Sequence, residues 1–267
     1  LARIDAARRA VMHGESAGRS AVEPWIERSW RRCLDSGQRP EHKVTFDAVS
    51  GPLLRRTLES NRDLVEAARP VLATLGRAIA STRYFAILTN AAGVVVDVNG
   101  PIDRTDRRAT LIARVGVDLS EASVGTTAIG AALIERSPVW LHRGEHFFND
   151  TSVYSCAGAP LFGPHGQCVG MLDLTGIDAV ERPELRHLVV RSARSIENAL
   201  TLRQPHHLLM RINWPGSAFG DESDGLIGLD ADGWVTGANP TANQLVPQLV
   251  ALARERIHSS DLFALPF

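Results

Sequence analysis

Cysteine is scarce in this chain of 267 residues, and its three cysteines have no regular spacing. Cys33, Cys156 and Cys168 form an odd set without a C-x-x-C pair, which argues against a disulfide framework. This usage is typical of a protein in a reducing cytoplasm. We expect all three to be small buried apolar residues rather than reactive thiols.

Long apolar runs and an excess of charge of one sign are also absent. No signal peptide is recognisable, and no apolar run approaches the ~18 residues that a membrane-spanning helix requires. The 29 basic and 30 acidic residues give a formal net charge of −1. A charge so close to zero argues against DNA or an anionic membrane as the main partner. We therefore expect a cytoplasmic chain without a membrane segment.

Hydrophobic residues make up 44% of the chain, enough for one large domain or two modest ones. Near the N-terminus, apolar residues recur at helical spacing between Pro24 and Gly37. A second helical region is predicted over about 52–81, with Ser50 as its N-cap. Pro70 is expected to kink or split this second region, because proline disrupts a helix interior.

The middle of the chain alternates short strand patterns with turns. Residues 84–89 and 94–100 are rich in β-forming residues and flank a Gly-containing turn, which predicts a hairpin. The other predicted elements are a helix over about 124–136 capped by Ser120 or Ser123, strands at 139–142, 153–162 and 167–175, and a long helix over about 183–210. This order predicts an α+β fold, an antiparallel sheet flanked by long helices.

Turn-forming residues over 213–223 mark a linker, after which residues 227–239 repeat the strand-turn-strand pattern of residues 87–99. Two related sheet-based modules in tandem are the simplest interpretation. We expect four regions: an N-terminal helical segment (1–50), a first domain with flanking helices (51–212), a linker (213–223) and the start of a second module (224–267). Because the chain begins without Met and stops after an apolar run, we expect a piece of a longer protein.

One motif suggests metal chemistry. Residues 142–146 match H-x-x-E-H, an inverted zinc-peptidase pattern that requires both histidines on one stable helix and a third ligand. Here His142 ends a predicted strand, Gly144 interrupts the motif and no third ligand is evident. A metalloenzyme or hydrolase that uses His142, Glu145 and His146 is therefore the weakest hypothesis, and we predict no catalytic residues and no metal.

A binding pocket requires less of the sequence: apolar walls and a few fixed polar groups. Residues 140–156 contain both kinds of side chain. Asp173 stands in an apolar predicted strand, so it either faces solvent or is a buried acceptor for a ligand hydroxyl group. No cofactor is expected. The predicted ligand-binding residues are Thr126, Thr127, Trp140, His146, Phe147, Phe148, Asn149, Asp150, Tyr154, Ser155, Cys156 and Asp173.

Several long stretches point to one family. The segments SEASVGTTAIGAAL, PVWLHRGEHFFNDTSVYSCAGAPLFGPHGQCVGMLDLTGID, RPELRHLV and SIENAL, with PWIERSWRRCLDSG before them, resemble the sensory half of acetoin-catabolism regulators. These are bacterial enhancer-binding activators of the sigma-54 RNA polymerase. The resemblance covers about Pro24 to Leu202. It implies a GAF sensor domain, then a PAS-like module, an AAA+ ATPase and a Fis-type helix-turn-helix, of which the last two are absent from this sequence.

The resemblance implies that a small polar organic effector, such as acetoin or a related ketone, diol or alcohol, controls the ATPase. DNA and the sigma-54 polymerase would be reached only through the domains that this sequence lacks. A homodimer through the helices at about 52–81 and 183–210 is expected. The alternative is a GAF-PAS module regulated by a partner protein. A filled, closed cavity would favour the partner, and an open, polar-lined one the small effector.

Overall fold

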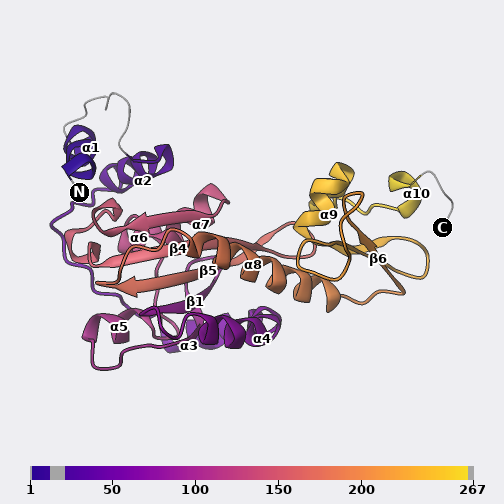
Figure 1. The fold of residues 1–267 in the computed structure, drawn as a ribbon, viewed down its shortest axis with the longest axis horizontal. Helices are drawn as coiled ribbons and strands as arrows, with labels where there is room; N and C mark the ends of the chain where they lie inside the picture. The colour runs from indigo at the N-terminus through magenta and orange to yellow at the C-terminus, as the bar shows by residue number, and fades with distance from the viewer. Residues whose placement is uncertain (1, 13–21, 264–267) are drawn as a thin grey trace.

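The computed structural model describes residues 2–12 and 22–263. A long helix, α8 (Leu185–Leu202), packs along the larger of two β-sheets and leads to the smaller one, as Figure 1 shows. The larger sheet has the order β2-β1-β5-β4-β3, and every neighbouring pair is antiparallel. Its strands are β1 (Tyr84–Asn90), β2 (Val95–Asn99), β3 (Val139–His142), β4 (Tyr154–Phe162) and β5 (Cys168–Ile177). The predicted α+β fold with an antiparallel sheet is confirmed.

One face of this sheet is covered by α4 (Arg62–Ala78) and α8, which bury its apolar side chains. The helical region predicted over 52–81 is divided into α3 (Gly51–Ser60) and α4. The division lies at Asn61 and not at Pro70, which is inside α4. Pro70 is exposed, so its ring lies on the solvent side of α4.

The opposite face of the sheet is covered by α5 (Arg107–Ile112), α6 (Glu121–Val124) and α7 (Ala128–Glu135). The single helix predicted over 124–136 was wrong at its start. Gly125 has φ +66° and ψ −157°, a conformation that ends α6 and that only glycine adopts readily. The chain then re-enters a helix at Ala128, where the hydroxyl oxygen of Thr127 accepts the N–H of Gly130 as an N-cap.

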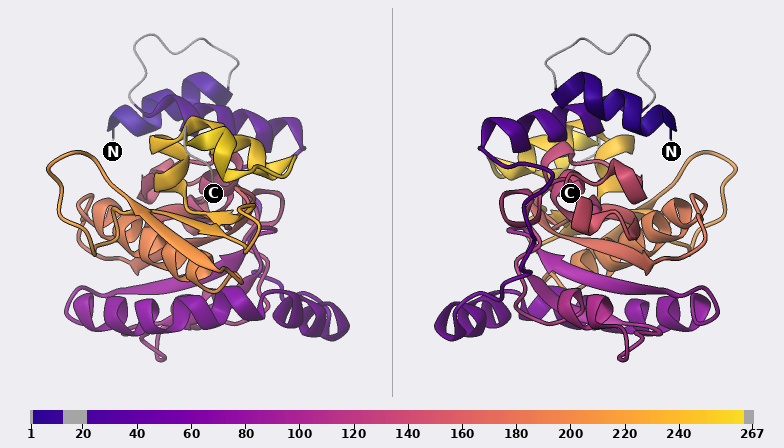
Figure 2. Two further views of the ribbon diagram at one scale, coloured as in Figure 1. Left: turned by 90° about the vertical axis from the view of Figure 1, so that its right-hand side faces the viewer. Right: turned by 90° about the vertical axis from the view of Figure 1, so that its left-hand side faces the viewer.

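A further layer lies outside α6 and α7. It consists of α1 (Ala2–Met12) and α2 (Pro24–Asp35), on the side of the sheet opposite α4 in Figure 2. The buried side chain of Trp30 packs there with Phe147 and Phe148, which follow the 3-10 turn η1 (Arg143–Glu145) and precede η2 (Asn149–Thr151). Both helices lie within the predicted helical segment 1–50, of which residues 1 and 13–21 are outside the described part.

The second sheet has the order β6-β7-β8 and is antiparallel. The helix predicted over 183–210 is too long, because α8 ends at Leu202, three residues before Pro205, which disfavours a helix. Residues 264–267 of the predicted second module are outside the described part. The remaining elements are β6 (Leu208–Ile212), β7 (Gly225–Leu229), β8 (Val235–Ala238), α9 (Pro240–Leu245), η3 (Pro247–Ala253) and α10 (Ser259–Leu262).

The two predicted hairpins have the same turn. In the first, the side-chain oxygen of Asn90 accepts the N–H groups of residues 92 and 94, and Gly93 has φ +85°. In the second, Asp230 accepts from residues 232 and 234, and Gly233 also has φ +85°. Both sheets therefore reverse the chain with an Asx turn that ends in a glycine of positive φ. Within the described ranges, no helix has the length and apolar character needed to span a lipid bilayer.

Candidate functional site

A small cavity of about 30 Å³ lies between the larger sheet and α5–α7. Its floor comes from β1, β4 and β5. Its roof comes from the first turn of α7, the end of α5, η2 and the neighbouring loops. This volume suits about two water-sized groups. The residues that line it are Phe46, Ile87, Ile112, Leu119, Thr127, Ala128, Ile129, His146, Thr151, Tyr154, Cys156, Asp173 and Thr175.

Asp173 carries the only carboxyl group among the lining residues, and its burial in this apolar setting costs free energy. It is fully buried in the middle of β5, and burial raises the pKa of its carboxyl group to about 7. The hydroxyl group of Thr175 donates a hydrogen bond to its Oδ2. Its Oδ1 is buried and has no hydrogen-bond partner among the described residues. Asp173 is therefore a buried residue of the cavity wall with one carboxyl oxygen that no described residue uses, and the alternative that it faces solvent is excluded.

His146 and Cys156 continue the polar part of the wall. The Nδ1 of His146 lies 3.0 Å from the carbonyl oxygen of Arg143, so this nitrogen carries the hydrogen and Nε2 is an acceptor. Nε2 lies 3.7 Å from the sulfur of Cys156, which is 3.5 Å from Oγ1 of Thr175. Burial lowers the pKa of His146 to about 4, so its ring is neutral at pH 7.

The same burial decides what this pair can do chemically. It raises the pKa of the Cys156 thiol well above its usual range, so the group stays protonated rather than becoming a nucleophilic thiolate. Cys156 and His146 can therefore form hydrogen bonds in the cavity wall, but they are not an activated catalytic pair. Tyr154 adds a hydroxyl group that donates to the carbonyl oxygen of Arg108 at 3.4 Å, and burial raises its pKa as well.

Five of the twelve predicted ligand-binding residues line this cavity. They are Thr127, His146, Tyr154, Cys156 and Asp173. Thr127 is the N-cap of α7, His146 lies in the loop that follows β3 and η1, and the other three residues lie in β4 and β5. The fold thus brings together residues that are far apart in the sequence. The other seven lie elsewhere.

Trp140 and Ser155 lie on the other face of the sheet. Trp140 is half-buried against the core beneath α4 and α8, because successive residues of β3 point to opposite faces and Val139 and Leu141 take the other one. Ser155 is buried, and its Oγ lies 2.7 Å from Nδ1 of His142.

The remaining predicted residues lie outside the cavity on the side of α1 and α2. Phe147 and Phe148 are buried in the core beneath these helices. Thr126 is fully buried and forms hydrogen bonds with α2. Asn149 and Asp150 are exposed, and the side-chain oxygen of Asn149 accepts a hydrogen bond from Arg8 at 3.1 Å.

The sequence interpretation missed eight lining residues, most of them apolar. Thr175 had a usable signal, because residues two apart on a strand share a face and Asp173 was already a candidate. Ile87 pairs with Asp173 across β1 and β5, which only the strand register reveals. The others are Phe46, Ile112, Leu119, Ala128, Ile129 and Thr151, from segments whose approach to the sheet is a tertiary feature.

The H-x-x-E-H motif does not form a metal centre in this structure. The carboxylate of Glu145 accepts the backbone N–H of His142 at 2.7 Å, while His142 and His146 use Nδ1 for other hydrogen bonds. Among the described residues, no group of three or more His, Cys, Asp or Glu side chains is arranged to hold a metal ion. The motif therefore shapes a strand end and a turn beside the cavity.

Comparison with known proteins gives the site a context. The chain is similar to the acetoin catabolism regulatory protein of Cupriavidus necator, with 30% identity over 238 residues, 86% of this chain and 35% of that protein. It is also similar to the propane 2-monooxygenase operon transcriptional activator MimR of Mycolicibacterium goodii, with 30% identity over 183 residues, 67% of this chain and 30% of that protein. The chain thus spans about a third of the length of these relatives.

A solved structure shows the same fold. The crystal structure of the E. coli DhaR(N)–DhaL complex is similar with a TM-score of 0.62 and 18% identity, over 84% of this chain and 76% of that chain. The relatives named above are a regulatory protein and a transcriptional activator, in agreement with the expectation that this chain is a regulator and not an enzyme. Residues 4–198, which include every residue that lines the cavity, match the family described as MimR, N-terminal domain, and the chain belongs to this family.

Proposed function

We propose that this chain is the sensory region of a sigma-54-dependent transcriptional activator that acts in the cytoplasm. In this proposal, residues 51–212 contain a GAF-type sensor domain and residues from 224 begin a PAS-like module. Its relation to regulators of catabolic operons supports this function. DNA and the polymerase would be contacted by further domains, because the chain spans only a third of those relatives.

The observation that carries the proposal is the free Oδ1 of Asp173 in the wall of a buried cavity. A buried polar oxygen without a partner costs free energy, of the order of 1–3 kcal/mol, which a ligand hydroxyl group would recover. Among the lining residues, only Asp173 has a pKa near neutral pH, and His146 is neutral there, so the wall offers no cation at pH 7. An anionic effector would therefore find no counter-charge, whereas an uncharged ketone, diol or alcohol such as acetoin fits the chemistry.

The size of the cavity sets a condition on this effector. A cavity of about 30 Å³ is too small for a molecule of six heavy atoms, so the roof must move when such a ligand enters. At the ceiling of ~1.5 kcal/mol for each heavy atom, six atoms give about 9 kcal/mol, a dissociation constant near micromolar. Part of that free energy would be used to move the roof, so we expect weaker binding.

A homodimer through the flanking helices would let two such ligands act together. The helix α3 lies at the start of the predicted dimer region, and its Leu53 and Leu58 are 49% and 37% exposed in the single chain. The only buried residue of α3 is Thr57. An amphipathic helix with so little burial in its own chain suits a contact with a second copy.

A partner protein is the second candidate for the regulator. The small volume of the cavity favours it, since an almost filled pocket is what a vestigial site would leave. The similar E. coli protein was crystallised in a complex with DhaL, which adds support for a protein ligand in this fold.

A thermal-unfolding screen separates the two candidates. The chain would be heated with acetoin, butanediol, dihydroxyacetone, acetone and simple alcohols. At a hundredfold excess over the dissociation constant, a bound ligand adds ~2.7 kcal/mol, which raises the Tm by several degrees. A shift in the native chain that is lost in Asp173→Asn supports an effector in the cavity. No shift with any compound at high millimolar concentration favours the partner protein.

A further inference from the structure

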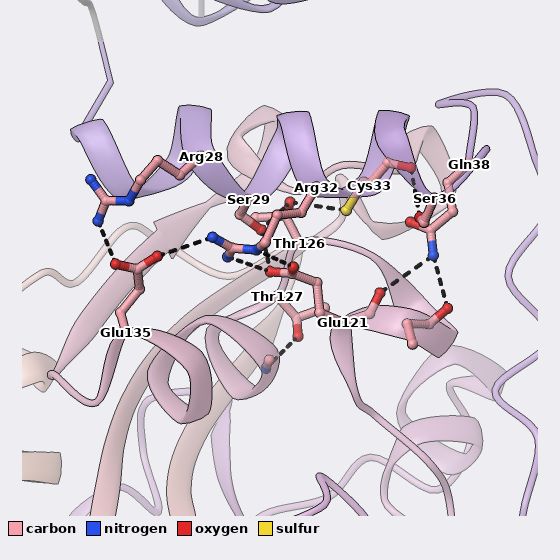
Figure 3. Close-up of polar contacts among 12 residues, drawn as sticks. Arg28, Ser29, Arg32, Cys33, Ser36, Gln38, Glu121, Thr126, Thr127 and Glu135 are labelled. Atoms are coloured by element: carbon pink, nitrogen blue, oxygen red, sulfur yellow. Dashed lines mark hydrogen bonds and ion pairs between the residues drawn. The ribbon is translucent and has the colours of Figure 1, made fainter.

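A buried polar cluster joins α2 to the two short helices above the cavity. Figure 3 shows Ser29, Arg32 and Cys33 of α2 directed toward Glu121 and Thr126. These contacts link residues about 90 positions apart, so they fix how the N-terminal helices sit on the sensor domain. The proposed effector function does not use any of them.

Glu121, the first residue of α6, is the centre of this cluster. Its side chain is 9% exposed and accepts two hydrogen bonds from the guanidinium of Arg32, at 2.7 and 2.9 Å. The hydroxyl group of Ser29 donates a third, at 2.5 Å. A bidentate Arg–carboxylate pair with an additional donor has a defined geometry, and it loses much of its strength when the partners move by an ångström. The docking of α2 is therefore sensitive to the position of α6.

The segment between α6 and α7 faces two ways. Thr126 is fully buried, and its Oγ1 lies 2.7 Å from the hydroxyl oxygen of Ser29 and 3.7 Å from the sulfur of Cys33. The next residue, Thr127, lines the cavity and caps α7, whose first residues Ala128 and Ile129 also line it. Consecutive residues thus contact α2 and the cavity.

This segment has little room for independent movement. At Gly125, a Cβ atom would lie 2.8 Å from the ring of Phe148, and the backbone is in a conformation that other residues rarely adopt. At Gly130, a Cβ atom would lie 2.8 Å from the backbone nitrogen and the Cβ of Glu121. Because α6 and α7 touch this closely, a shift of the first turn of α7 moves Glu121 and Thr126 with it.

We propose that the docking of α2 and the state of the cavity are coupled through the segment 125–127, with Thr126 and Glu121 as the positioning residues. Movement of the roof when the cavity is filled then changes the fit of α2, and by reciprocity α2 sets the position of Thr127 in the site. The signalling role of this coupling rests on the proposed function, whereas the coupling itself is a property of the chain.

Hydrogen exchange tests the coupling without any ligand. Cys156→Ala enlarges the cavity from below, and Ile87→Val does so from another strand if the first variant folds poorly. Exchange of the α2 amides is measured by mass spectrometry in each variant alone and combined with Thr126→Val. We expect the cavity variant alone to change the exchange rate of the α2 amides at least fivefold, the lower end of a typical coupling. In the background of Thr126→Val, the same cavity change should alter this rate less than twofold.

Two controls separate coupling from general destabilisation. Thr126→Ser keeps the hydroxyl group and is expected to keep the fivefold response. Arg28→Gln removes an ion pair between α2 and Glu135 at the far end of α7, with Arg28 half exposed, and is expected to leave the response unchanged. The proposal is overturned if the cavity change alters amide exchange in β4 and β5 but not in α2. It is also overturned if the exchange of α2 changes by the same factor with and without Thr126→Val. Because no effector is used, neither result depends on whether the cavity binds one.

Discussion

Thr175 donates its hydroxyl hydrogen to Oδ2 of Asp173, two residues earlier on the same face of β5. This single hydrogen bond is the only one that the described residues provide to the carboxyl group, and Oδ1 has none. It favours the ionised form, but burial disfavours that form more strongly, and the pKa of Asp173 is raised to about 7. A residue that titrates near neutral pH therefore stands in the wall of the cavity.

Asp173→Asn is expected to change the pH dependence of stability. Because the pKa is raised in the folded state, native Asp173 contributes stability below about pH 4 that is lost as the pH rises toward 7. Three pH units correspond to at most about 4 kcal/mol of unfolding free energy. The variant lacks this loss, so its stability relative to the native chain should increase from pH 4 to 8.

Urea unfolding at several pH values measures this difference. His146 and Glu197, which also have shifted pKa values, are present in both proteins and largely cancel in the comparison. Parallel stability curves for the two proteins would mean that Asp173 is ionised normally and is not buried as described.

Tyr154 and Trp140 are expected to differ in their effect on ligand binding. Tyr154→Phe removes a hydroxyl group from the cavity wall, and should weaken effector binding about tenfold, the cost of one hydrogen bond. Trp140→Ala changes the opposite face of the sheet and should leave the affinity unchanged, although it lowers stability. Calorimetric titration of both variants with the compound found in the screen checks this. A loss of binding only in Trp140→Ala would place the site outside the cavity.

The hairpins show what the sequence could predict. An Asn or Asp followed three residues later by Gly is a local signal, and it correctly located both turns because the Asx contact and the positive φ are made within five residues. The end of α8 was missed for the opposite reason. Leu208, Leu209 and Met210 continue a helical pattern, but their pairing with β7 holds them in a strand.

The same distinction explains the candidate site. The residue types between 140 and 156 predicted a pocket, but the side of the sheet on which Trp140 lies depends on the register of β3 with β4. Phe147 and Phe148 are covered by α2, whose Trp30 bonds to the carbonyl oxygen of Glu145 from 115 positions away. No local pattern predicts a partner so distant. The apolar roof of the cavity was missed for this reason.

Phe147→Ala is expected to loosen the N-terminal helices. Phe147 is fully buried between Phe148 and α2, and its truncation leaves a cavity that should cost about 3–5 kcal/mol of unfolding free energy. Phe219→Ala is the matched control, because Phe219 is 63% exposed and should change stability by less than about 0.5 kcal/mol. Chemical denaturation followed by tryptophan fluorescence gives both values. Equal small losses would show that α2 does not cover Phe147 in solution.

Gly170→Ala tests the central pairing of the larger sheet. Gly170 faces Asn90 where β5 pairs with β1, and a Cβ atom there would lie 2.1 Å from the carbonyl oxygen of Thr89. A backbone atom in the middle of a sheet cannot move aside as a flexible side chain does. The methyl group therefore has to push β1 away from β5. The loss of unfolding free energy should be larger than about 1–3 kcal/mol, the usual cost of overpacking.

Gly51→Ala is the control for the glycine change itself. Gly51 begins α3 and has no heavy atom within 4 Å of an added Cβ, so alanine should be neutral or should stabilise the chain by up to about 1 kcal/mol. The unfolding free energies of both variants, measured under the same conditions, give the comparison. A Gly170→Ala variant as stable as Gly51→Ala would contradict the register of β1 with β5. Because that register sets Ile87 opposite Asp173, it would also remove the basis for placing these two residues in one cavity.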